Sequence, residues 1–294
     1  MQDSFYRQFG SARSVTKQYG TSYYLATLFL KPVVRDATFA LYRWVRIPDE
    51  IVDNAEEKGI ENAEEKLADY EAQWATAYAN HTNDSENMRT VAKIFRDYDI
   101  PYEYSAMFLA AMRTDLTKSR YQDYDELTEY MKGSAAAVGL MMCHILGHDE
   151  GALPYAKQLG NAMQMTNFLR DIAEDIDQRD RIYLPQDIMQ RFGVSDRDII
   201  THNADKVRPL IKHLTKFSHD LYEQSLPGIF MLHQGRFAVA YAAFMYREIL
   251  YKLAQVEHDP FPGRVFSTKR DKLRLVCTTL LFLAKGPSQF EKRQ

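Results

Sequence analysis

Two pairs of aspartates at helical spacing are the residues of this sequence that point most directly to chemistry. Asp49 and Asp53 lie in the segment 40–54, among apolar residues such as Leu41 and Val45. A spacing of four places both carboxylates on one face of a helix, and Glu57 extends this acidic ladder by one turn. Like charges at this spacing are mildly destabilising, by a few tenths of a kcal/mol. A cation between them would remove that cost.

The second acidic stripe is Asn167, Asp171 and Asp175, at positions i, i+4 and i+8 beside an apolar stripe. Mg²⁺ prefers oxygen ligands and is commonly held by one or two carboxylates together with substrate phosphates. Two such helices facing each other across a cavity would therefore suit a diphosphate bridged by Mg²⁺. The alternative interpretation is that both stripes are solvated helix faces.

Two arginines accompany the aspartates. Arg46 precedes Asp49 by three residues, and Arg170 is adjacent to Asp171. A planar guanidinium can bind phosphate oxygens through two hydrogen bonds. Each arginine could equally form an ion pair within its own helix, and such pairs contribute little to stability.

The composition is that of an ordinary globular protein. The 294 residues include 37 Lys and Arg against 40 Asp and Glu, for a formal charge of −3, so no basic footprint indicates nucleic acid. The longest uncharged run, 133–147, is shorter than the roughly 20 residues that span a bilayer. Residues 1–14 are charged and lack an apolar signal region, so a cytoplasmic location is expected. Cys143 and Cys277 lie in apolar stretches and are interpreted as reduced core thiols.

The elements that must position these residues are helices. Apolar residues recur every three or four positions, for example over 123–146, and no comparable stretch alternates with period two. Loops are expected at 80–87 and at 179–193, the latter with a short helix, and the tail 285–294 is expected to fray. The pattern predicts an all-α fold with residues 1–294 in a single domain.

Six segments together resemble the squalene and phytoene synthase family, the head-to-head trans-isoprenyl diphosphate synthases, over about residues 19–272. The matching segments are 21–30, 40–54, 125–141, 159–176, 181–185 and 264–272. The resemblance implies an isoprenoid synthase helical bundle around a central apolar channel. It also implies Mg²⁺, with Mn²⁺ as an alternative, and no NADPH.

The resemblance also assigns roles residue by residue. The metal would be held by Asp49, Asp53, Asn167, Asp171 and Asp175, the four aspartates being catalytic. Substrate-binding positions are Ser22, Tyr42, Arg46, Gln164, Asn167, Arg170, Arg264 and Lys272, and Tyr130 and Tyr246 would line the reacting centre. Channel-wall positions are Thr27, Phe39, Ala136 and Gly139.

The implied reaction joins two geranylgeranyl diphosphates, through cyclopropyl prephytoene diphosphate, into phytoene, the first step of carotenoid biosynthesis. The small Thr27 favours this C40 product, whereas Phe39 could narrow the same channel. Ser134, Ala135 and Ala136 stand where the family usually reads Val-Ala-Gly. One alternative is a C30 synthase that uses farnesyl diphosphate, of the presqualene diphosphate, squalene or dehydrosqualene type. Another is a non-catalytic assembly protein, which would be expected to lose the aspartates.

Long-chain substrates and an oily product imply peripheral membrane contact for release of the product. The sequence shows no obvious basic amphipathic patch that would locate this contact. The oligomeric state is left open.

Overall fold

The computed structural model describes residues 10–80 and 85–286, and this part of the chain is helical without strands. The all-α prediction is confirmed. The first helices are α2 (Ala12–Tyr19), α3 (Thr21–Thr27), α4 (Pro32–Asp53), α5 (Ala63–Asn80), α6 (Glu86–Asp97) and α7 (Tyr102–Asp115). Next come α8 (Tyr124–Met131), the π-helical η1 (Lys132–Ala136), α9 (Ala137–Leu146), α10 (Ala152–Arg179), α11 (Gln186–Arg191) and α12 (Asp196–Ile200). The last are α13 (Ala204–Ser225), the 3₁₀-helical η2 (Leu226–Met231), α14 (Arg236–Gln255) and α15 (Lys269–Lys285).

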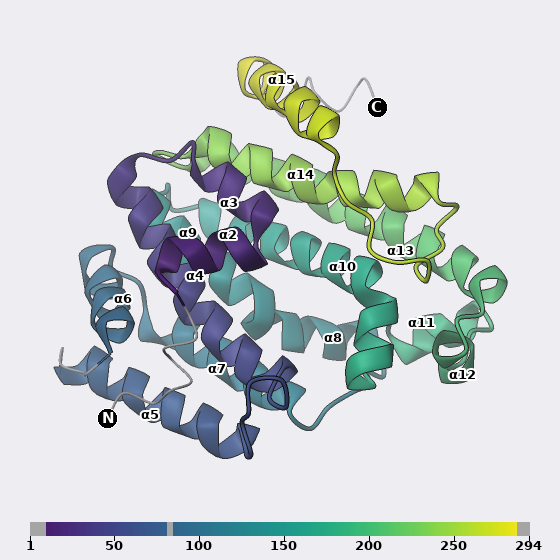
Figure 1. Cartoon of the computed structure of the whole chain (residues 1–294). Coiled ribbons are helices and arrows are strands. Elements are labelled where there is room, and N and C mark those ends of the chain that lie inside the picture. The colour runs from purple at the N-terminus through teal and green to yellow at the C-terminus, as the bar shows by residue number, and fades with distance from the viewer. Residues whose placement is uncertain (1–9, 81–84, 287–294) are drawn as a thin grey trace.

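The two aspartate pairs lie on the long helices α4 and α10. Helix α4 begins with Pro32, whose fixed φ suits the first helical position, and it buries Leu41, Trp44 and Ile51 completely. Helix α10 occupies the interior of the bundle and packs against α9, α13 and α14 (Figure 1). The aspartates lie toward the C-terminal end of each helix.

The segment 123–146 is helical, as its apolar repeat predicts, but it is not one uniform α-helix. Its middle, η1, adopts the wider π-helical turn between α8 and α9. Gly133 allows this turn to approach α7 closely, since a Cβ there would lie 2.2 Å from the main-chain oxygen of Met107. Insertions of this kind often occur at functional sites because they re-aim nearby side chains.

The structure tests four other expectations from the sequence. Helix α4 ends at Asp53, so Glu57 lies in the following turn and the acidic ladder stops one turn early. Helix α11 supplies the short helix expected within 179–193. Lys285 closes α15, and the rest of the predicted frayed tail from 287 lies outside the described residues, as do 81–84 of the loop 80–87. The Cys277 prediction is wrong because its side chain is exposed, whereas Cys143 is buried.

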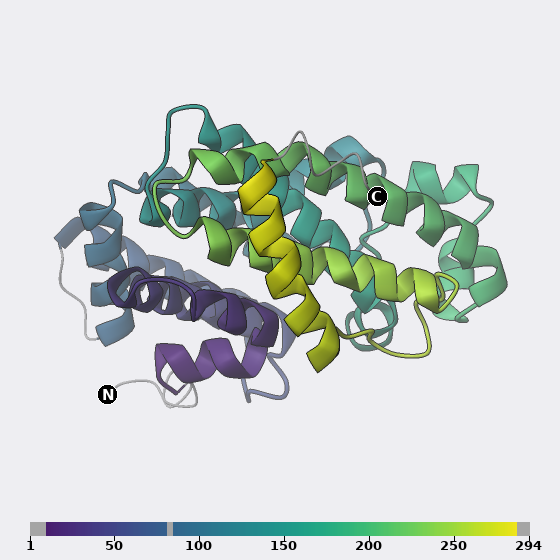
Figure 2. The ribbon, with the colours of Figure 1, turned by 90° about the horizontal axis from the view of Figure 1, so that it is seen from above.

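Helix α15 crosses the outside of α14 and lies at the surface of the molecule (Figure 2). It is joined to the bundle by a small apolar cluster that includes Ala26, Tyr241, Leu275 and Phe282. None of the helices in 10–80 and 85–286 has both the length and the hydropathy required to cross a bilayer.

Candidate active site

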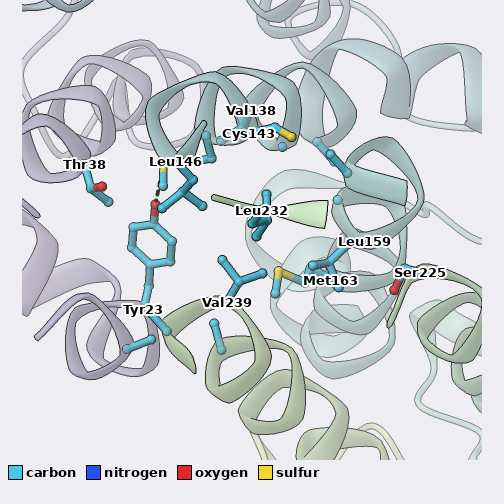
Figure 3. A pocket seen from close by; sticks show the side chains of 18 of the residues that line it. Tyr23, Thr38, Val138, Cys143, Leu146, Leu159, Met163, Ser225, Leu232 and Val239 are labelled. Atoms are coloured by element: carbon cyan, nitrogen blue, oxygen red, sulfur yellow. Dashed lines mark hydrogen bonds between the residues drawn. The ribbon is translucent and has the colours of Figure 1, made fainter. Parts of the chain in front are cut away.

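An apolar cavity of about 280 Å³ lies between α3, α4, α9, α10 and α14. Figure 3 shows Leu146, Leu159, Met163, Leu232 and Val239 pointing into it. Its polar lining includes Tyr23, Tyr42, Gln164 and Tyr246. Tyr42 is one turn from Arg46, and Tyr246 lies within electrostatic reach of Arg170. The cavity therefore adjoins the charged ends of the aspartate helices.

Tyr23 and Tyr42 form the wall of the cavity beside α3. Their rings stack with centroids 5.3 Å apart, and the Tyr23 hydroxyl donates to the Met142 sulfur at 3.2 Å (Figure 3). Gly20 leaves room for this pair, since a Cβ there would lie 2.7 Å from the Tyr42 hydroxyl. Burial raises the pKa of both tyrosines, so both hydroxyls remain protonated.

The predicted wall residues divide into two groups. Thr27 and Gly139 line the cavity. Phe39 and Ala136 are buried but are not among its lining residues. Phe39 stacks on Tyr24, with centroids 5.7 Å apart, and Ala136 packs against Gly160 of α10. The π-turn instead directs Ser134 and Ala135 toward the cavity.

The first aspartate motif is paired with arginines. Asp49 forms an ion pair with Arg46, whose guanidinium also binds the buried Glu50 and lies 4.6 Å over the Tyr19 ring. Asp53 forms an ion pair with Arg181. Burial raises the pKa of Asp49 to about 6, although Arg46 opposes the shift.

The second motif is held in the same way. Asp171 accepts hydrogen bonds from both Nε and Nη2 of Arg170, at 2.8 and 2.6 Å, and from Nε of Arg264 at 2.8 Å. Burial and the neighbouring Asp171 raise the pKa of Asp175 to about 8. Asn167 donates to Gln164 at 3.4 Å, while its own side-chain oxygen is buried without a hydrogen-bond partner.

Arg179 connects the two motifs. Its guanidinium lies 3.4 Å from Asp175 on its own helix and 3.8 Å from Asp53 on α4, and it also pairs with Glu174. Arg264 reaches the same Glu174 at 2.9 Å. Carboxylates separated by more than a hundred residues of sequence thus face each other across one guanidinium.

The sequence interpretation did not single out Arg179, Arg181 or Glu174. A signal existed for Arg179, which follows Asp175 by one helical turn, and for Arg181, which opens the matching segment 181–185. Nothing in the sequence placed Glu174 between two arginines.

Tyr130 is buried but does not line the cavity. Its hydroxyl donates to Asp115 at 2.5 Å, and Tyr183 donates to the other oxygen of the same carboxylate at 3.0 Å. Arg181 donates to the main-chain oxygen of Asp115 at 2.9 Å and forms its ion pair with Asp53. Asp115 therefore connects these two tyrosines, through Arg181, to the first motif. Burial raises the pKa of Asp115 to about 7, so the ionised carboxylate destabilises the folded protein.

Asp115→Asn is expected to change the pH dependence of stability. Because the folded-state pKa of Asp115 is raised above its unfolded value near 4, its contribution is fully present below about pH 4 and is lost as pH rises through about 7. The wild type should lose about 3 kcal/mol more of unfolding free energy between pH 4.5 and 8 than the variant does. Urea unfolding at both pH values measures this difference. If the unfolding free energy changes equally with pH in the two proteins, Asp115 is not the group that titrates.

Ser22 and Lys272 lie apart from these contacts. Ser22 is in the first turn of α3, and Lys272 is in the first turn of α15, where its main-chain oxygen accepts from Tyr241 at 3.0 Å. Within 10–80 and 85–286, neither side chain lines the cavity or pairs with a motif aspartate. Their assigned diphosphate contacts stay predictions.

The two motifs present carboxylate and amide oxygens, which are the type of ligand that a hard divalent cation prefers. No three His, Cys, Asp or Glu side chains of the described part converge as a metal-holding group, because arginines occupy the spaces between carboxylates. The side-chain oxygen of Asn167 is buried without a hydrogen-bond partner, and burial raises the pKa of Asp49 and Asp175. A cation near these oxygens would offset the cost of burying them. Mg²⁺ needs few protein ligands when a diphosphate supplies the others.

Facing aspartate helices beside an apolar cavity within an all-α bundle define the isoprenoid synthase class of fold. A crystal structure of a dehydrosqualene synthase superimposes with a TM-score of 0.84 and 26% identity, covering 96% of this chain and 99% of that one. The squalene synthase of Alicyclobacillus acidocaldarius shares the fold, with a TM-score of 0.76, 22% identity, and coverage of 89% and 98%.

The chain belongs to the squalene/phytoene synthase family, whose model matches residues 16–273. The members of this family are prenyltransferases. The phytoene synthase of Thermus thermophilus is 35% identical, over 94% of this chain and 93% of that protein. The 15-cis-phytoene synthase of Synechocystis sp. is 32% identical, over 89% and 81%. The chain spans 65% of the chloroplastic phytoene synthase of an Oncidium hybrid, at 32% identity over 89% of this chain.

Proposed function

We propose that this protein catalyses the Mg²⁺-dependent head-to-head condensation of two prenyl diphosphates. The observation that carries the proposal is Arg179 in contact with both aspartate motifs, beside a cavity lined by apolar residues. This arrangement provides separate places for the two parts of a prenyl diphosphate, because the diphosphate needs charge and the chain needs an apolar wall.

Arginines supply the permanent positive charge for diphosphate release. Arg46, Arg170, Arg179 and Arg264 all reach motif carboxylates, and each can exchange an aspartate oxygen for a diphosphate oxygen when substrate binds. Mg²⁺ held by Asp49, Asp53, Asn167, Asp171 and Asp175, or Mn²⁺ in its place, would neutralise the departing diphosphate.

The cavity would then govern the fate of the allylic cation. Departure of the first diphosphate leaves this cation, and the double bond of the second substrate attacks it to give a new carbocation. Loss of a proton from this carbocation, which the released diphosphate can accept, closes the cyclopropane ring of the cyclopropyl diphosphate. Departure of the second diphosphate allows rearrangement, and loss of a proton gives a conjugated triene. Tyr42 and Tyr246 present ring faces that stabilise positive charge without reacting with it, and the apolar walls exclude water.

Geranylgeranyl diphosphate is the substrate we favour, which makes phytoene the product and carotenoid biosynthesis the pathway. Two findings support this choice: Thr27 lines the cavity, and the similar curated proteins are named phytoene synthases. The similar dehydrosqualene synthase structure favours a second candidate, C30 synthesis from farnesyl diphosphate.

Neither route that ends in a triene consumes NADPH. We further propose that 1–294 act as one cytoplasmic domain with peripheral membrane contact.

Product analysis tests the proposed function. The protein is incubated with C15 and C20 prenyl diphosphates and Mg²⁺, and products are identified by mass. We expect a C40 triene from the C20 substrate and loss of turnover when a chelator removes Mg²⁺. Formation of C30 product alone would exclude the C40 assignment. Absence of any condensation product with either substrate would exclude the activity itself.

A further inference from the structure

One side of α15 is apolar and exposed. The helix packs Leu275 and Phe282 against α14, whereas Leu273, Leu280 and Leu281 are 71, 55 and 54% exposed. Together with the exposed Cys277, these leucines stand at i, i+4, i+7 and i+8, so they form one stripe opposite the packed side. We call Leu273, Cys277, Leu280 and Leu281 the outer face of α15. A contiguous exposed apolar face indicates a contact with something other than water.

Basic residues border this outer face. Lys269 and Arg270 are exposed in the first turn of α15, and Lys285 is exposed at its end. Arg274 lies between them and is 56% exposed even though it pairs with Glu248 of α14. A helix that combines an apolar stripe with flanking lysines and arginines is suited to lie on an anionic lipid surface.

A second exposed apolar segment lies close by, at the turn between α3 and α4. Leu28 and Phe29 are 40 and 51% exposed, while Thr27 and Leu30 on either side of them line the cavity. The Phe29 ring lies 5.5 Å from the Tyr241 ring on α14, and the Tyr241 hydroxyl donates to α15 at the main-chain oxygen of Lys272. The turn and α15 therefore flank one part of α14, with the cavity wall directly beneath the turn.

We propose that the outer face of α15, together with Leu28 and Phe29, docks on an anionic lipid bilayer. A second copy of the chain fits the surface less well, because a symmetric contact would bring the basic borders of two α15 helices together. Docking would set the wall formed by α3 and α14 against the hydrocarbon layer, which is the source and destination of long prenyl chains. This surface locates the membrane contact that is part of the proposed function, but docking requires no turnover and can be tested without it.

Vesicle flotation of the full chain tests the surface. The vesicles contain phosphatidylcholine alone or a mixture with phosphatidylglycerol, and no substrate is added. The wild type is expected to float with the anionic vesicles only. Replacing Leu273, Leu280 and Leu281 by Gln, or Lys269 and Arg270 by Glu, should each reduce the bound fraction about tenfold. The matched control is Ile200→Gln, since Ile200 is 53% exposed on the distant α12.

Condensation assays in detergent separate docking from catalysis. Both sets of α15 variants should retain wild-type turnover in detergent, because none of these side chains lines the cavity. Equal flotation of the variants and the wild type would overturn the proposal, as would an equal loss in Ile200→Gln. A wild-type dimer that the leucine variant converts to monomer would assign the face to a second copy. A protein that floats as expected yet makes no product would contradict the proposed function alone.

Discussion

Asp171→Asn is expected to reduce turnover of prenyl diphosphates by at least about 10²-fold while the protein stays folded. Asp171 is the carboxylate on which Arg170 and Arg264 converge, with three hydrogen bonds of 2.6–2.8 Å. The amide keeps the shape of the side chain but removes its charge. The metal would lose a ligand, and two arginines would lose the partner that orients them. Steady-state release of diphosphate at saturating Mg²⁺ measures the effect.

The matched control for this substitution is Asp177→Asn on the same helix. Asp177 is 54% exposed and pairs with His202, away from the cavity. Its amide variant should keep turnover within about twofold, since exposed ion pairs contribute little. Circular dichroism and the melting temperature should be similar for both variants and the wild type. Retained turnover in Asp171→Asn would contradict the metal assignment.

Thr27→Phe is expected to change the length of the product. Thr27 is buried, lines the cavity from the end of α3, and donates to the main-chain oxygen of Tyr24 at 2.7 Å. A phenyl ring at this position would occupy space needed by a C20 chain, at an overpacking cost of about 1–3 kcal/mol. Formation of C40 product should fall at least about tenfold, whereas C30 product from the C15 substrate should persist. Competition between C15 and C20 substrates, followed by mass analysis, gives the ratio directly.

Thr27→Val separates the size of the side chain from its hydroxyl. Valine has nearly the same shape and loses only the hydrogen bond to Tyr24. It should keep the wild-type ratio of C40 to C30 product and lose about 1 kcal/mol of stability. A shift toward C30 product in Thr27→Val would show that the hydroxyl matters, and an unchanged ratio in Thr27→Phe would exclude Thr27 as a limit on chain length.

The local features of the site follow from helical periodicity. The spacing of Asp49 and Asp53, and of Asn167, Asp171 and Asp175, predicts one face on each of two helices, and α4 and α10 carry them in that way. The contact between Arg170 and Asp171 joins neighbouring residues of α10, and an ion pair within the helix is one of the two alternatives that the sequence leaves open for Arg170. The all-α class follows from the same repeat of apolar residues.

Residue spacing does not predict which side chains of different helices meet. The sequence did not indicate that Tyr130 would donate to Asp115 outside the cavity lining, nor that a π-turn would direct Ala135 toward the cavity in place of Ala136. Each depends on how closely two helices approach, which small residues such as Gly133 and Gly160 decide through contacts with α7 and η1. The exposure of Cys277 likewise depends on which side of α15 meets α14.

Residue type and spacing along the chain are enough to predict the helices, the charged faces of two of them and the family. The position of Arg179 between Asp53 and Asp175, and the uncovered outer face of α15, follow from how the helices pack. Periodicity sets only the direction of a side chain around its own helix axis. The side chain it meets across the bundle is set by the packing of the whole core.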